Sequence, residues 1–201
     1  MLTLCDLKVI RNEEPLLAPL NQTFEPGNCY HLRGPNGLGK TTLLRVLAGI
    51  YQDYSGQFEW RQSPLYIGHK PGLQPALTVS ENMQLLLGVN GLEHSTAILD
   101  TLLLALELLP SQHLPISRLS AGQQRRVGMS LLWHPAAASR PWLLDEPFAT
   151  LDTQISVELE QRIISQCLQA QLVLLTSHQS MDTLSAAACF NTFAPLAADQ
   201  R

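Results

Sequence analysis

A glycine-rich turn between a strand pattern and a helix pattern constrains the fold of this 201-residue chain more than any other feature. Residues 28–33 alternate as a strand does, and residues 40–50 place apolar side chains on one side of a helix. Glycines in such a turn let backbone N–H groups point inward at an anion, and the helix adds its positive end. The turn therefore predicts a phosphate-binding loop made of Gly34, Pro35, Asn36, Gly37, Leu38 and Gly39, followed by Lys40, Thr41 and Thr42.

The residues that open the predicted helix carry the chemistry of a nucleotide site. The spacing Gly-x-x-x-x-Gly-Lys-Thr is met without exception from Gly34 to Thr41. Lys40 can reach the β- and γ-phosphates of a nucleoside triphosphate, and the Thr41 hydroxyl can ligate Mg²⁺. The alternative is a glycine-rich turn without a ligand, but the strand before it and the helix after it favour the nucleotide site.

Two consecutive carboxylates end a second apolar strand pattern. Residues 142–144 are apolar, and Asp145 and Glu146 follow them directly. In a parallel sheet such a strand delivers its acids to the edge where ligands bind. Asp145 is then expected to hold Mg²⁺, directly or through water, and Glu146 to polarise the attacking water. Taken alone, the run is equally compatible with a polar strand end that caps the next helix.

The order of patterns predicts an α/β fold with a largely parallel sheet, because apolar strand runs alternate with longer helical runs. Residues 70–118 differ, since they hold a capping-box start at Thr78 and a helix of about 17 residues that follows Gly91 and ends at Leu108. We therefore expect one domain over residues 1–201, with a core from about 1–69 and 119–201 and a helical subdomain between them. A later helix is predicted from its four-residue period, Ile155, Leu159, Ile163 and Cys167.

A third motif identifies a family. Residues 119–124 read Leu-Ser-Ala-Gly-Gln-Gln, in which Ser120 is a good N-cap for a helix whose free amides face an anion. With the phosphate loop, the Asp-Glu strand end and the run Leu-Thr-Ser-His at 175–178, the chain resembles the nucleotide-binding subunits of ABC transporters. The resemblance implies a P-loop NTPase fold: a RecA-like parallel sheet, an antiparallel N-terminal β subdomain and an inserted helical subdomain. It also implies that the chain is an ATPase that uses ATP and Mg²⁺.

The resemblance further implies that two copies pair head to tail around two ATP molecules. Ser120, Gly122 and Gln123 would then contact the ATP bound to the other copy. His178 would contact the γ-phosphate, and Asp152 would bridge the two copies. Two simpler interpretations stay open, because Asp152 could only cap the helix that starts at Thr153, and His178 could be an ordinary strand-end residue.

Two positions depart from the family pattern. His69 stands where a glutamine is usual; a neutral imidazole can accept a hydrogen bond from water, but a protonated one cannot, so activity is expected to fall at mildly acidic pH. Arg11 stands where an aromatic residue usually stacks on adenine. A guanidinium can also stack on a base, so Arg11 is expected to bind the adenine with weaker selectivity.

Several runs are similar to the ATP-binding subunits of the cytochrome c maturation (haem-export) systems. These runs are residues 65–72, 119–127 and 142–148, and His69 is itself typical of that group. The resemblance implies integral membrane partners of the maturation B, C and D types, and hydrolysis linked to release of a haem-loaded chaperone. It places the chain peripherally at the cytoplasmic face of a bacterial inner membrane, held there only through its partners. We expect a partner helix to dock near residues 71–77.

Composition limits the alternatives. With 13 basic and 17 acidic residues the chain has no basic surplus, so nucleic acid is not an expected partner. That argues against a soluble ABC ATPase of translation or DNA repair, whereas the ATPase subunit of another small-substrate exporter stays open. Among the remaining residues, Cys29 and His31 are expected to pack in a strand, and Arg125 and Arg126 to be solvated.

Overall fold

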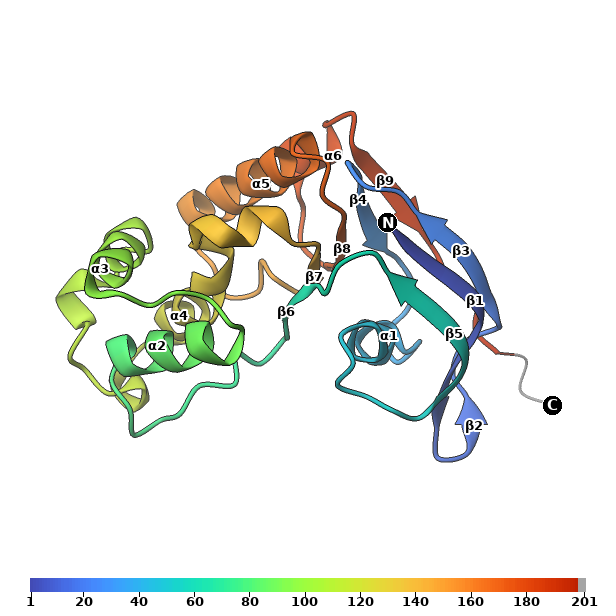
Figure 1. Cartoon of the computed structure of the whole chain (residues 1–201), viewed down its shortest axis with the longest axis horizontal. Helices are drawn as coiled ribbons and strands as arrows, with labels where there is room; N and C mark the ends of the chain where they lie inside the picture. Colours follow the sequence, from blue (N-terminus) through green and yellow to red (C-terminus); the bar gives the residue numbers. More distant parts are fainter. Residues whose placement is uncertain (199–201) are drawn as a thin grey trace.

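A computed structural model describes residues 1–198, and its centre is a five-stranded sheet in which every neighbouring pair is parallel (Figure 1). Two of its strands are buried along their whole length, as expected of a parallel sheet covered on both faces. In spatial order the strands are β6 (Leu65–Ile67), β7 (Trp142–Asp145), β8 (Val173–Thr176), β4 (Cys29–Leu32) and β9 (Phe190–Phe193).

A second, antiparallel sheet is built around the first strand of the chain. Its core packs with helix α1 (Lys40–Leu47) and with Leu143 and Leu174 of the parallel sheet, so α1 is shared by both sheets. This arrangement confirms the predicted α/β class with antiparallel N-terminal strands. The strands are β1 (Leu2–Arg11), β2 (Glu14–Pro15), β3 (Leu20–Phe24) and β5 (Tyr54–Trp60).

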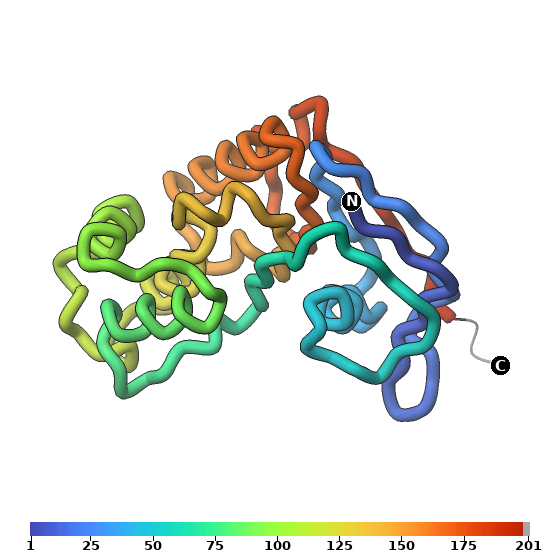
Figure 2. Tube along the Cα trace, viewed as in Figure 1, coloured from blue at the N-terminus to red at the C-terminus, as the bar shows by residue number. Residues whose placement is uncertain are grey.

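The chain leaves the parallel sheet after β6, forms a helical region, and returns through a long helix, as the tube in Figure 2 shows. Residues 70–118 contain helices and turns without a strand. Besides α1, the helices are α2 (Val79–Val89), α3 (Thr96–Ala105), α4 (Ala121–Trp133), α5 (Thr153–Leu168) and α6 (Asp182–Ser185), with short 3₁₀ helices at Leu109–Ser111, Ile116–Arg118 and Pro135–Ser139. None of these described helices is long and apolar enough to cross a bilayer.

Local helix signals differ in how well they predicted the boundaries. The capping box at Thr78 is present, and the four-residue period of α5 is confirmed because all four of its residues are buried. The expected helix of about 17 residues was wrong, since α3 has only 10. Helix α3 ends at Ala105, and Glu107 has a φ of 54°, which a helix cannot contain. The apolar pattern continues past Ala105 because Leu106 and Leu108 are buried in the core. Helix α1 is also shorter than expected, because Gly49 has a φ of 74°.

One buried amide fixes the loop that leads from the sheet into α2. The Asn82 side chain is 1% exposed, and its Oδ1 accepts from the backbone N–H of Gln74 at 2.8 Å. Its Nδ2 contacts the carbonyl oxygens of Gln74, Leu77 and Thr78 at 3.1, 3.1 and 2.9 Å. The loop therefore obtains from one side chain the hydrogen bonds that a strand would obtain from a neighbour.

We predict that Asn82→Ala lowers the free energy of unfolding by about 2 kcal/mol, because it leaves buried loop groups without partners. Urea unfolding of the variant and of the wild type measures this difference. The control is Gln84→Ala, which truncates an exposed side chain of the same helix. Equal losses in the two variants would show that the amide does not hold the loop.

Candidate functional site

The phosphate-binding loop lies between β4 and α1, where the sequence predicted it. Gly37 and Gly39 have φ values of 83° and 102°, which residues with a Cβ rarely adopt. The turn brings the loop back over the start of α1, so that Lys40 Nζ donates to the carbonyl oxygens of Gly34 at 2.7 Å and Pro35 at 3.0 Å. The loop and the helix start therefore present one ammonium group and a row of amides to the same space.

A pocket of about 570 Å³ opens beside this loop and gathers residues from both sheets. It brings together most of the residues that were predicted for a nucleotide site, although they are far apart in the sequence. Of the predicted set, it is lined by Arg11, Asn36, Gly37, Leu38, Gly39, Lys40, Thr41, Thr42, His69, Asp145, Glu146 and His178. Gly34 lines an adjoining cavity of about 420 Å³ with His31 and His178.

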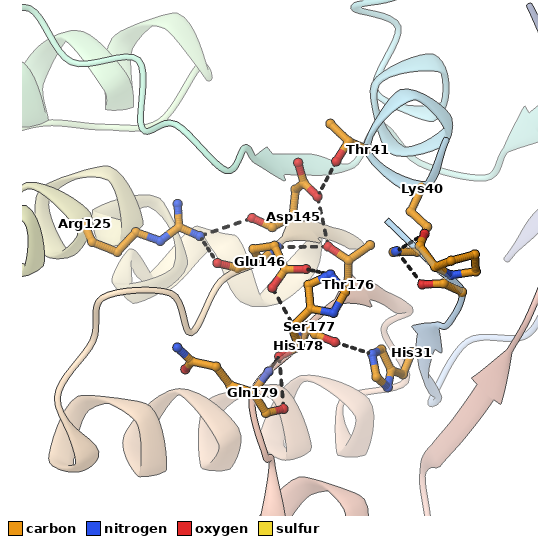
Figure 3. Close-up of polar contacts among 12 residues, drawn as sticks. His31, Lys40, Thr41, Arg125, Asp145, Glu146, Thr176, Ser177, His178 and Gln179 are labelled. Carbon is orange, nitrogen blue, oxygen red and sulfur yellow. Dashed lines mark hydrogen bonds and ion pairs between the residues drawn. The ribbon is translucent and has the colours of Figure 1, made fainter. Parts of the chain in front are cut away.

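Asp145 is the last residue of β7 and is completely buried. Its Oδ1 accepts hydrogen bonds from the hydroxyls of Thr41 at 3.0 Å and Thr176 at 2.9 Å (Figure 3). Its Oδ2 is buried and has no hydrogen-bond partner in the structure. A buried carboxylate oxygen without a partner, beside a threonine hydroxyl, is a donor set that suits Mg²⁺. These residues therefore fit the predicted metal.

Glu146 and His178 face each other at the edge of the pocket (Figure 3). His178 Nε2 lies 3.5 Å from Glu146 Oε1, and the His178 backbone N–H donates to Glu146 Oε2 at 3.1 Å. Glu146 has a φ of 51°, and its own N–H donates to Thr176 Oγ1 at 3.0 Å. Both carboxylate oxygens thus contact His178, while Thr176 holds the backbone bend, and the group lines the pocket, where a carboxylate can accept a proton from water.

The signature residues, Ser120, Gly122 and Gln123 of the motif at residues 119–124, do not line this pocket. Ser120 caps α4 in a reciprocal pair, with its Oγ accepting from Gln123 N–H at 3.2 Å and Gln123 Oε1 accepting from Ser120 N–H at 3.0 Å. Asp152 caps α5 by accepting from Ile155 N–H at 3.0 Å, and its other oxygen lies 3.4 Å from Arg126. The capping interpretation of Asp152 is therefore correct within one copy of the chain, and its contact with a second copy stays a prediction.

The comparisons with known proteins agree with this geometry. The family model described as ABC transporter matches residues 17–149. The chain is 36% identical over 188 residues to the cytochrome c biogenesis ATP-binding export protein CcmA of Sodalis glossinidius, covering 88% of each chain. It is 37% identical to the CcmA of Haemophilus influenzae over 193 residues, covering 90% of each.

The chain belongs to the ABC transporter ATP-binding family. As a member it binds ATP and is an ATPase. A solved ABC transporter ATP-binding protein of Pyrococcus furiosus has the same fold, with a TM-score of 0.74 at 22% identity over 95% of this chain and 96% of that chain.

In this ABC ATPase the expectation that Arg125 and Arg126 are solvated is wrong. Arg125 was expected in solvent, but it is 3% exposed, and its guanidinium donates to backbone carbonyls around the pocket. Burial lowers the pKa of Arg125, while the negative charges of Asp145 and Glu146 oppose that shift. Arg126 is also mostly covered, at 17% side-chain exposure, and pairs with Glu107 at 2.8 Å. The helical sequence pattern could not predict the burial of either arginine, because their partners lie in other segments of the chain.

His31 and Cys29 have structural explanations. His31 Nε2 lies 3.1 Å from the Ser177 carbonyl oxygen, and burial lowers the pKa of its ring. Burial raises the pKa of the Cys29 thiol, as expected for a strand residue packed in the core. No group of three or more metal-ligating side chains occurs in residues 1–198. The sequence analysis missed Arg45, Tyr51 and Thr176, which also line the pocket; only Thr176 carried a signal, since it ends a strand beside Asp145.

We predict that Asp145→Asn removes most of the gain in ATP affinity that Mg²⁺ provides. The change keeps the shape of the side chain, so the two threonine hydroxyls keep their acceptor, but it replaces the partnerless carboxylate oxygen with an amide. Titration with a fluorescent ATP analogue, in Mg²⁺ and in EDTA, measures the effect. Asp53→Asn, at an exposed position, is the control. An unchanged Mg²⁺ dependence would rule out Asp145 as the metal ligand.

Proposed function

We propose that this chain is the ATP-hydrolysing subunit of a membrane exporter of the cytochrome c biogenesis type. The observation that carries the proposal is the identity of 36–37% with CcmA proteins over about nine-tenths of the chain, together with a pocket that gathers most of the predicted nucleotide-site residues. His69 in the pocket supports the same assignment, since it is the departure typical of that group. ATP hydrolysis then drives release of a haem-loaded chaperone by the membrane complex.

Each residue of the pocket has a proposed role. The loop from Gly34 to Gly39 and Lys40 bind the phosphates, and Thr41 with Asp145 holds Mg²⁺, which neutralises phosphate charge when it is bound. Glu146 accepts a proton from the attacking water, and His178 contacts the γ-phosphate. Arg11 lies at the end of β1 on the pocket wall, where its guanidinium can stack on the adenine.

A second copy of the chain completes the site in this proposal. Ser120 and Gln123 are outside the pocket, and the N-terminus of α4 can therefore direct its amides at a nucleotide bound by another copy. Gly122 lies close to the turn before Asp152, because a Cβ on it would be 3.0 Å from the Thr150 carbonyl oxygen. The signature residues and Asp152 thus belong to one continuous surface, as pairing with a second copy requires.

The membrane partners are proposed to be integral subunits of the maturation B, C and D types, with this chain peripheral at the cytoplasmic face of the inner membrane. The segment 71–77 is a suitable docking place, since most of its residues are exposed and Asn82 fixes its backbone. Leu73 packs against the core from this segment, so a docked helix would contact a loop of defined shape.

We predict that Glu146→Gln lowers the ATP hydrolysis rate by a factor of about 10² to 10⁴ and traps an ATP-bound dimer, because binding groups remain while the proton acceptor is lost. Phosphate release and light scattering with MgATP measure the two effects. Glu59→Gln, at an exposed position of β5, is the control and should behave as the wild type. A Glu146→Gln chain that stays monomeric with MgATP while the wild type hydrolyses ATP would contradict the paired site.

We also predict that the chain sediments with membranes only when B-, C- and D-type subunits are co-expressed. The reason is that, in the proposed complex, the integral membrane subunits provide the attachment of this chain to the membrane. Fractionation with and without the partners measures this, and a haem spectrum of the affinity-purified complex tests the haem assignment. If the chain instead associates with membranes that contain the subunits of an unrelated exporter, it is the ATPase subunit of another small-substrate exporter.

A further inference from the structure

Arg125 connects three segments through one side chain. Its Nη1 donates to the carbonyl oxygens of Gly68 at 2.7 Å and His69 at 3.2 Å. Its Nη2 donates to those of Glu146 at 2.7 Å and Asp145 at 3.3 Å (Figure 3). Its Nε donates to that of Pro147 at 3.3 Å. The guanidinium therefore joins helix α4 to the loop that carries His69 and to the strand end that carries Glu146.

The hydrogen bonds of the buried guanidinium hold these three segments in a fixed arrangement. A buried guanidinium is costly unless its N–H groups all find acceptors, and here five backbone carbonyls supply them. The negative charges of Asp145 and Glu146 further stabilise the cation. The planar fork of an arginine fixes both the distance and the angle between the groups it binds, which a lysine ammonium cannot do.

A second contact attaches the same loop to the same helix. Gly128 lies three residues after Arg125 on α4, so the two positions share a face. A Cβ added to Gly128 would overlap the Pro71 ring, so the backbone of α4 touches the loop directly at this point. The segment from Gly68 to Pro71 is therefore held against α4 at both of its ends.

We propose that Arg125 is a positioning residue that sets Glu146 and His69 relative to helix α4. The inference rests on the proposed function, in which the first turn of α4 contacts the nucleotide of the other copy. When Ser120 of one copy contacts the nucleotide of the other copy, helix α4 of the first copy then fixes Glu146 and His69 in that first copy's own site. Arg125 touches neither nucleotide, so its loss affects the rate of hydrolysis far more than the binding of ATP.

The first test compares Arg125→Met, which removes every donor, with Arg125→Lys, which keeps the charge without the fork. The full-length chain with its co-purifying subunits is assayed for kcat, KM and MgATP affinity. We expect kcat to fall by about 100-fold in the methionine variant and by an intermediate factor in the lysine variant, since small misplacements of catalytic groups have effects of this size. MgATP affinity should change by less than about threefold on the same argument. Arg61→Gln, far from the pocket, is the control.

The second test does not depend on the stability of the Arg125 variants. Gly128→Ala is expected to push the loop away and lower kcat, although alanine favours the helix itself. Pro71→Gly removes the ring that the added methyl group would meet, so the double variant should regain part of the lost kcat. Strictly additive effects of the two changes would overturn the proposed attachment.

The outcomes separate this inference from the proposed function. If the wild type hydrolyses ATP and both Arg125 variants keep its kcat, or lose kcat and MgATP affinity equally, Arg125 is not a positioning residue. If the wild-type complex hydrolyses no ATP, the proposed function is wrong and the inference falls with it. A selective loss of kcat that is largest with methionine and intermediate with lysine supports both.

Discussion

The buried carboxylate of Asp145 is the constraint on which the rest of the site depends. A charged group with no exposure is tolerated only where donors or a cation satisfy it. Thr41 comes from the helix after the phosphate loop, and Thr176 comes from the neighbouring strand, so one oxygen ties three elements together. The other oxygen is left for a cation. The same carboxylate therefore both orders the pocket and defines where positive charge is needed.

The parallel sheet explains why these groups meet at all. Strands β4, β7 and β8 run in one direction and are neighbours in the order β7-β8-β4, so their carboxyl ends deliver the loop, the acids and His178 to one edge. Arg125 approaches the end of β7 from the helical side, where it binds backbone carbonyls. A buried anion and a buried cation thus stand on either side of one strand end, and each lowers the cost of burying the other.

The parts of the molecule that could be predicted from the sequence are those decided by short-range interactions. Capping boxes at Thr78 and Ser120 join groups three residues apart, and the phosphate loop is a continuous run. Arg125 could not be predicted in this way, since its acceptors Gly68 and Glu146 are 57 and 21 residues distant. The predicted length of α3 was wrong for a related reason. Other segments bury Leu106, so the apolar pattern of the sequence continues past the end of the helix.

Helix α4 has backbone N–H donors at its start that its own capping box does not use. Ser120 and Gln123 cap each other, which pairs the first and fourth amides of the turn and fixes the shape of the helix start. The amides of Ala121 and Gly122 are not used in that pair, and the Ser120 hydroxyl, which accepts from Gln123, can still direct its proton outward. Because the turn is already rigid, an anion that approaches it needs little further ordering of the chain. A preorganised helix start of this kind would suit the proposed contact with a nucleotide bound by a second copy.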